Sequence, residues 1–183
     1  MPIQIVILNG GSSSGKSSIA RALQGVLPEP WLTFGVDDFV DALPPAMQNS
    51  KDGLVFLPNG GISVGPGIRR LREAWECGIA GIAGAGVGVI IDDVFLSGGA
   101  AQERWRAALR GRHILWVGVR CEPVVAARRE AQRGDRVPGM AASQAELVHR
   151  GVAYDLAIDS TNASPEACAR LIVDRIANTA VTS

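Results

Sequence analysis

The chain has 183 residues, of which 47% are hydrophobic and 20% are charged, and this length is enough for one compact domain with a substantial core. Its 18 Lys and Arg residues balance its 18 Asp and Glu residues, so there is no broad basic surface and we expect no nucleic-acid partner. No apolar run reaches the roughly 20 residues of a membrane span, so we expect a cytoplasmic protein that does not associate with a membrane.

Apolar strands and amphipathic helices alternate along the chain. Strands are expected at residues 3–8, 31–36, 87–91, 113–119 and 154–158, and helices at residues 17–26, 38–43, 67–85, 100–109, 122–132, 141–150 and 164–178. Two short apolar runs within residues 48–66 predict a hairpin inserted between helices. The alternation is typical of a mostly parallel sheet with helices on both faces, in a single α/β domain over residues 1–183.

A glycine-rich segment lies between the first expected strand and the first expected helix. It reads GGSSSGKS and matches the phosphate-loop pattern G-x-x-x-x-G-K-[ST]; the alternative is a chance match in a Gly/Ser connector. In this position, backbone N–H groups surround a polyphosphate, Lys16 reaches its outer phosphates and Ser17 ligates Mg²⁺. We therefore expect a P-loop site for a nucleoside triphosphate, formed by Gly10, Gly11, Ser12, Ser13, Ser14, Gly15, Lys16, Ser17 and Ser18.

Two carboxylates end the third expected strand. In doubly wound sheets, ligands collect at the carboxyl ends of the strands, so Asp92 or Asp93 is expected to hold Mg²⁺ beside the phosphate loop. Asp92 is the preferred metal residue because it comes first after the apolar run, where a Walker-B acid stands. The alternative is that the pair caps the following segment.

Asp37 and Asp38 close the second expected strand, where a carboxylate can face a phosphate acceptor. Phosphoryl transfer to a hydroxyl needs a group that orients this hydroxyl and receives its proton. We assign this catalytic role to Asp37 and helix capping to Asp38, and the exchanged assignment is the alternative.

Arginines gather around a loop rich in Gly and Pro at about residues 133–139, which we interpret as a mobile lid: Arg128, Arg129, Arg133 and Arg136. Arg133 and Arg136 are expected to act in catalysis by neutralising the transferred phosphoryl group and excluding water. For Arg128 and Arg129, the main alternative is a solvated helix face with acidic partners, Glu130 and Asp135.

Several apolar residues flank the acceptor side and the insertion: Phe39, Val40, Leu43, Met47, Val55 and Phe56. They could line a pocket for an aromatic substrate, and core packing is the alternative.

With these residues in view, nearly the whole chain resembles the chloramphenicol phosphotransferases. The resemblance rests on the strings ILNGGSSSGKSS, LPEPWLTFGVDDFVDALPPAMQ, VIIDDVFLSGGAAQERWR, LWVGVRCEPVVAARREAQRGDRVPGMAASQ and HRGVAYDLAIDST. It implies a five-stranded parallel sheet ordered 2-3-1-4-5, as in shikimate, gluconate and adenylate kinases. It also implies that ATP phosphorylates the primary hydroxyl of chloramphenicol.

Residue by residue, the resemblance makes Asp37 the family's proposed base, places Lys16 and Ser17 in its phosphate loop, and matches Arg136 to a lid arginine taken as essential. Departures from the family's pattern lie at residues 38–40 and 49–57, near the acceptor. One alternative is therefore a kinase of another small hydroxylated metabolite, and another is a nucleotide-binding switch. The sequence does not fix the oligomeric state, and a homo-oligomer stays open.

Overall fold

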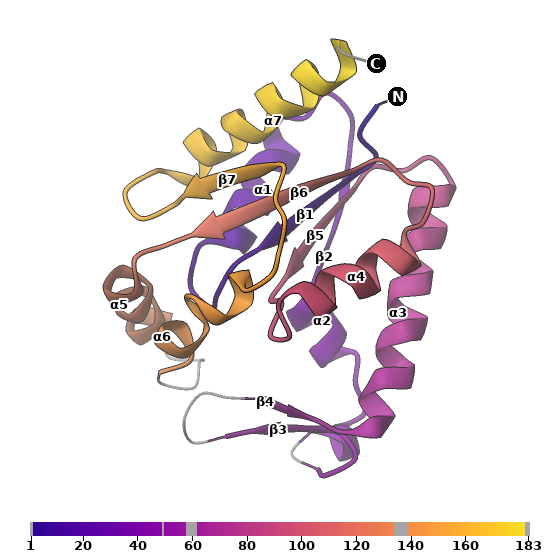
Figure 1. The fold of residues 1–183 in the computed structure, drawn as a ribbon, viewed down its shortest axis with the longest axis vertical. Helices are drawn as coiled ribbons and strands as arrows, with labels where there is room; N and C mark the ends of the chain where they lie inside the picture. The colour runs from indigo at the N-terminus through magenta and orange to yellow at the C-terminus, as the bar shows by residue number, and fades with distance from the viewer. Residues whose placement is uncertain (1, 49, 58–61, 134–138, 182–183) are drawn as a thin grey trace.

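The computed structural model describes residues 2–48, 50–57, 62–133 and 139–181, and a parallel sheet of five strands forms its centre (Figure 1). The strands are β1 (Ile5–Asn9), β2 (Leu32–Gly35), β5 (Val89–Asp93), β6 (Ile114–Arg120) and β7 (Leu156–Asp159), in the order β2-β5-β1-β6-β7. Numbered within this sheet alone, the order is 2-3-1-4-5. The expected fold class is confirmed.

Strand β1 lies in the middle of the sheet, and its side chains alternate between two buried layers. Ile5 and Ile7 belong to one hydrophobic cluster, whereas Val6 and Leu8 belong to another. Because both faces of a central parallel strand are covered, both sets of alternating positions are apolar. This is why the first strand reads as a continuous apolar run.

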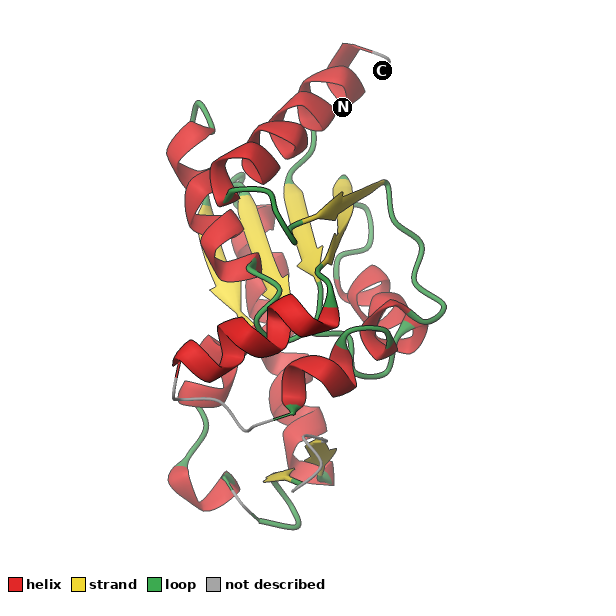
Figure 2. Cartoon of the chain, turned by 90° about the vertical axis from the view of Figure 1, so that its left-hand side faces the viewer, coloured by secondary structure: helices red, strands yellow, loops and turns green. Residues whose placement is uncertain are grey.

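Helices cover the two faces of the sheet. Helices α1 (Lys16–Val26) and α7 (Pro165–Val181) pack together on one face, and α3 (Pro66–Gly84) and α4 (Gly99–Ala108) pack together on the other (Figure 1). Three further helices lie near the carboxyl ends of the strands: α2 (Val36–Asp41), α5 (Pro123–Arg133) and α6 (Met140–Gln144). In Figure 2, the strand arrows point toward this end of the molecule. None of the helices in the described ranges is long and apolar enough to cross a membrane.

The insertion carries a small core of its own at the end of the molecule away from the termini (Figure 1). Strand β3 (Leu54–Phe56) pairs antiparallel with β4 (Ile62–Val64), which agrees with the expected hairpin, and residues 58–61 lie outside the described ranges. Leu54 packs there with Phe39, Leu43 and Ile68. The hairpin is thereby attached to the residues that follow β2 and begin α3.

The helix expected at residues 141–150 is wrong as a continuous element. Helix α6 ends at Gln144, and a 3-10 turn follows at Leu147–His149. The side chain of Asn9 donates a hydrogen bond to the carbonyl of Val148, and His149 turns inward to contact the Tyr154 hydroxyl. These tertiary contacts override the local helical propensity.

Candidate active site

The glycine-rich segment forms a tight turn between β1 and α1. Ser13 and Gly15 both have positive φ angles, 58° and 91°, and alternation of this kind turns successive backbone N–H groups toward one concavity. Gly10 is required for packing, because a Cβ there would collide with the carbonyl oxygen of Val119 on β6. The Nζ of Lys16 donates a 2.9 Å hydrogen bond back to the carbonyl of Gly11. The sequence therefore folds into the phosphate loop that its pattern predicts.

Two hydroxyl groups of this loop fit an anionic ligand. The Oγ atoms of Ser13 and Ser14 are buried, and neither has a hydrogen-bond partner among the described residues. Buried polar groups in native proteins are nearly always hydrogen-bonded, so an orphaned pair in one loop needs an explanation. The phosphate oxygens of a nucleotide would accept hydrogen bonds from them, beside the amino end of α1, where the helix dipole favours negative charge.

Two polar residues outside the motif, Gln144 and Ser160, hold the loop in place, and a third, Asn9, fixes the chain after β5 beside it; the sequence reasoning did not single them out. Gln144 accepts a 2.9 Å hydrogen bond from the backbone N–H of Ser12, and Ser160 donates a 2.6 Å bond to the carbonyl of Ser14. Asn9 accepts a 2.9 Å bond from the N–H of Phe95. Only Asn9 carried a signal, as a polar residue ending an apolar strand, because the other two contacts join segments more than 130 residues apart.

Asp92 lies beside the phosphate loop. Its Oδ2 accepts a 2.6 Å hydrogen bond from the Ser17 hydroxyl, and its Oδ1 lies 3.8 Å from the Nζ of Lys16. One hydroxyl and one carboxylate suit Mg²⁺, which binds few protein ligands and completes its octahedron with water and phosphate. No cluster of three or more His, Cys, Asp or Glu side chains able to hold a metal exists within the described ranges.

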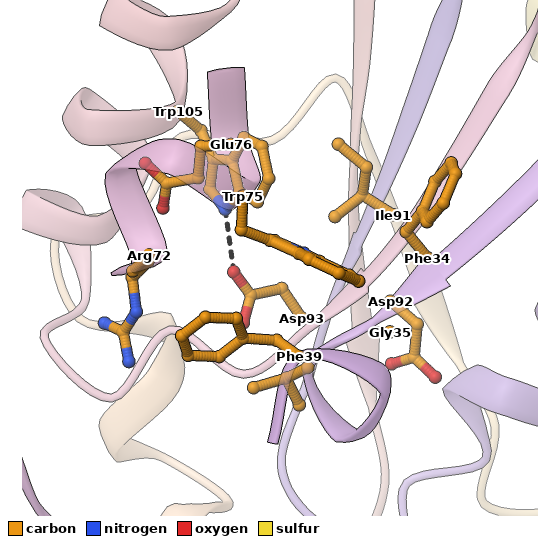
Figure 3. Close-up of a pocket in the computed structure, with 11 residues that line it drawn as sticks. Phe34, Gly35, Phe39, Arg72, Trp75, Glu76, Ile91, Asp92, Asp93 and Trp105 are labelled. Atoms are coloured by element: carbon orange, nitrogen blue, oxygen red, sulfur yellow. Dashed lines mark hydrogen bonds between the residues drawn. The ribbon is translucent and has the colours of Figure 1, made fainter. Parts of the chain in front are cut away.

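Asp93 is used differently from its neighbour. One of its carboxylate oxygens accepts a 2.7 Å hydrogen bond from the indole N–H of Trp105 (Figure 3). The other accepts a 2.7 Å bond from the N–H of Val94. Both oxygens are thus engaged in fixing α4 and the chain after β5. The structure separates the two carboxylates, which the sequence could not do.

The two carboxylates after β2 also differ. Asp38 accepts a 2.6 Å hydrogen bond from the N–H of Gly35 and so closes the amino end of α2. This contact starts the helix at Val36, earlier than the expected residue 38, and places Asp37 in its exposed first turn. Asp38 therefore takes the capping role expected for it, and Asp37 is exposed in the first turn of the helix.

An open pocket, whose empty volume of about 300 Å³ includes open solvent, lies between β2, β5 and α3 (Figure 3). Its lining combines four aromatic residues with charged and small ones: Phe34, Gly35, Val36, Phe39, Arg72, Trp75, Glu76, Ile91, Asp92, Asp93 and Trp105. Of the apolar residues expected on the acceptor side, Phe39 lines this pocket. Leu43 is buried in the small core of the insertion, against which Val40 and Met47 pack.

Charged residues that line this pocket are partly or fully buried. Glu76 is buried and accepts a 2.8 Å hydrogen bond from the Nε of Arg104, yet burial raises the pKa of its carboxyl against the effect of that arginine. Burial, together with the positive charge of Arg104, lowers the pKa of Arg72. No sequence pattern indicated this group, because Arg72 and Glu76 come from α3 and Arg104 comes from α4.

The arginines expected in the lid are found in different settings. Arg133 is the last residue of α5 and not a loop residue, and Arg136 lies outside the described ranges. Arg128 is exposed, as its alternative interpretation required. Arg129 instead donates hydrogen bonds of 2.9 and 3.2 Å to the carbonyls of Ser160 and Thr161, so it anchors α5 to the chain after β7.

Glu130 is not the arginine partner that the alternative interpretation assumed. It is buried, and its two oxygens accept hydrogen bonds of 2.8 and 2.7 Å from the N–H groups of Gly139 and Ala141. These bonds fix the amino end of α6, the helix that supplies Gln144 to the phosphate loop. Glu130 thereby connects α5 to the loop across the segment 134–138, which is not described.

Sequence comparisons agree with this geometry. The family model described as chloramphenicol phosphotransferase-like protein matches residues 3–177 of the chain. A protein of Mycobacterium tuberculosis, provisionally named an O-phosphotransferase, was found in strains CDC 1551 and H37Rv; in each it is 32% identical over 177 residues, covering 86% of this chain and 75% of the relative.

Solved structures of kinases share the fold. A sugar kinase from Janibacter sp. HTCC2649 matches with a TM-score of 0.70 at 18% identity, over 96% of this chain and 95% of that one. A gluconokinase from Sinorhizobium meliloti 1021 matches with a TM-score of 0.62 at 18% identity, over 99% and 95% of the two chains. Shikimate kinase from Acinetobacter baumannii also scores 0.62, at 15% identity, over 97% and 94%. The fold is that of the P-loop kinases.

Proposed function

The chain belongs to the chloramphenicol phosphotransferase-like family, and from this premise we propose that it transfers the γ-phosphoryl group of ATP to the primary hydroxyl of chloramphenicol. Phosphotransfer from a nucleotide to a hydroxyl follows from the family and the P-loop fold. The identity of the acceptor, its inactivation as an antibiotic and a cytoplasmic location are part of the proposal.

The observation that carries the proposal is the position of Asp92. Its carboxylate contacts Ser17 and lies near Lys16 at the phosphate loop, and the same residue lines the aromatic cavity. The nucleotide side and the acceptor side therefore meet at one residue. A nucleotide-binding switch has no use for such a cavity, whereas phosphoryl transfer requires the two substrates to lie in line.

In this mechanism the acceptor hydroxyl oxygen forms a bond to the γ-phosphorus, and the bond from that phosphorus to the bridging oxygen of ADP breaks. Asp37, at the exposed start of α2, orients the hydroxyl and accepts its proton. The backbone of the phosphate loop and Lys16 hold the phosphates, and Arg133 and Arg136 are proposed to neutralise the transferred group.

Ser17 and Asp92 are the residues that would hold Mg²⁺. When bound, this ion neutralises charge on the phosphate oxygens during transfer. Their 2.6 Å hydrogen bond brings the two oxygens together before the ion is present. The ligand set is completed by phosphate and water, as Mg²⁺ prefers.

The proposal is tested by mass spectrometry of a reaction that contains the purified protein, ATP, Mg²⁺ and chloramphenicol. We expect a product heavier by one phosphoryl group, and we expect none from Lys16→Ala. Lys51→Ala is the matched control, because Lys51 is exposed and lies in the insertion, away from the phosphate loop. A product from a different hydroxylated acceptor alone would replace chloramphenicol as the substrate. The absence of any phosphorylated acceptor would overturn the proposal.

A further inference from the structure

Arg72 is the charged residue of the cavity whose role the proposed reaction leaves open. It lies near the start of α3, lines the cavity and is partly buried. Within the described ranges its guanidinium has no hydrogen bond and no ion pair shorter than 4 Å, although it carries five N–H donors. A partly desolvated guanidinium in this state is suited to an external acceptor.

The neighbouring carboxylates are already engaged. Glu76 pairs with Arg104, and Asp93 accepts from Trp105 and the N–H of Val94. They attract Arg72 only at longer range, while Arg104 repels it. An acceptor group entering the cavity therefore faces little competition for the donors of Arg72 from its own protein.

The positions of the cavity residues set the shape of the acceptor. In Figure 3, Arg72 and Asp92 lie on opposite sides of Phe39, with Trp75 above this ring. The reacting hydroxyl must lie at the Asp92 side, where the phosphate loop delivers the phosphoryl group. The body of the acceptor then lies against aromatic rings, and its far end approaches Arg72.

We propose that Arg72 determines acceptor specificity by binding a planar group with two oxygens, a carboxylate or a nitro group, at the end of the acceptor remote from its reacting hydroxyl. A guanidinium presents two parallel N–H groups that match two oxygens in one plane, which a lysine ammonium does not. This inference rests on the proposed function, because it places the hydroxyl beside Asp92. The preferred substrate is thus an aromatic or apolar compound with a hydroxyl at one end and such a group at the other.

The test uses three probes that differ at one position: chloramphenicol, which has a nitro group on its ring, and two analogues with a carboxylate or a methyl group instead. Their dissociation constants are measured by calorimetry in the presence of Mg²⁺ and a non-hydrolysable ATP analogue, and KM and kcat are measured separately with ATP. The proteins are wild type, Arg72→Met, Arg72→Lys and the control Arg70→Met, whose arginine is exposed on the same helix and does not line the cavity.

Wild type is expected to bind the carboxylate most tightly, then the nitro compound, then the methyl analogue. Arg72→Met should weaken carboxylate binding by about 10 to 100-fold, since hydrogen bonds to charged groups are worth about 1.5 to 3 kcal/mol. The same variant should change the dissociation constant of the methyl analogue by less than about twofold. For the two-oxygen probes, it should raise KM more than it lowers kcat. Arg72→Lys should restore part of the carboxylate affinity and little of the nitro affinity, and Arg70→Met should behave as wild type.

The inference is overturned if wild type does not prefer the two-oxygen probes over methyl, if it binds neither of them, or if Arg72→Met weakens all three probes equally. Equal weakening would assign a structural role to Arg72. Failure of the proposed function gives a different result, in which the probes bind with the expected order but no phosphorylated product forms with ATP.

Discussion

The phosphate side and the acceptor side of the site are built in different ways. The phosphate loop is joined by hydrogen bonds to Gln144 and Ser160, each more than 130 residues away along the chain, and it leads into α1, which packs in the large core of the sheet. The acceptor side depends on a small cluster around Phe39 and Ile68 and on two three-residue strands. In the proposed function, the phosphate chemistry common to many kinases thus lies on the large core, and acceptor selection lies on a small core that can change independently.

The largest effect that tests this comparison is expected at Asp37, on the acceptor side. Asp37→Asn keeps the size of the side chain but removes the proton acceptor, so kcat should fall by about 10²- to 10⁴-fold. Nucleotide affinity should stay unchanged, because the phosphate loop is untouched. The measurements are steady-state kinetics and ATP titration calorimetry. Asp41→Asn, an exposed change on the same helix, is the control, and a loss below tenfold would remove Asp37 from the reaction.

The phosphate side should respond to acid through His149. This residue is buried, and burial, followed by the charge of Arg120, lowers its pKa from 6.5 to about 4. Asn9 donates to the Tyr154 oxygen, so the Tyr154 hydroxyl donates in turn to Nδ1 of neutral His149. Protonation of His149 therefore favours the unfolded chain. Stability should be full above pH 6.5 and should fall by about 3 kcal/mol as the pH drops to about 4, at about 1.4 kcal/mol per pKa unit.

Urea unfolding between pH 4 and 7 measures this loss. His149→Gln should remove most of the pH dependence in this range, and His113→Gln should retain it, because the other histidine is not buried. An unchanged pH dependence in His149→Gln would show that other groups cause the acid response.

The next prediction separates the two carboxylates that end β5. Asp92→Asn should raise the Mg²⁺ concentration needed for half-maximal activity by about tenfold or more, by analogy with the loss of metal-site groups, with little change in stability. Asp93→Asn should instead lower the free energy of unfolding by about 1 to 3 kcal/mol, because an amide nitrogen cannot accept from Trp105 or Val94. Metal titrations and urea unfolding measure the two effects, and identical profiles for the two variants would contradict this separation.

Sequence patterns predicted the elements whose structure depends mainly on residues close together in the chain. The alternation of apolar strands and helices predicted the sheet, and GGSSSGKS predicted the phosphate loop, because both depend on local spacing. The contacts of Gln144 and Ser160 with that loop were not predictable, since each joins residues more than 130 positions apart. The pairing of Glu76 with Arg104 was hidden for the same reason, as it connects α3 with α4.

The smallest effect is expected at Glu130. A change there tests whether α6 holds the phosphate loop in position. Both Glu130 oxygens accept backbone N–H groups at the start of α6, which supplies Gln144 to Ser12. In Glu130→Gln, the amide nitrogen faces one of these N–H groups, so one bond is lost and the free energy of unfolding should fall by about 1 to 2 kcal/mol. Because α6 then holds Gln144 less firmly, KM for ATP should rise by a few-fold and acceptor KM should not change.

Glu29→Gln is the matched control for this change, since Glu29 is exposed in the turn before β2. Urea unfolding and kinetics with each substrate varied in turn measure the response. A rise in acceptor KM equal to that for ATP would show that α6 supports both sides of the site, and the division between the two sides would then be incomplete. A rise in the KM for ATP alone would place Glu130 among the residues that position the nucleotide. The contact between α5 and α6 would then support the phosphate loop and not the acceptor side.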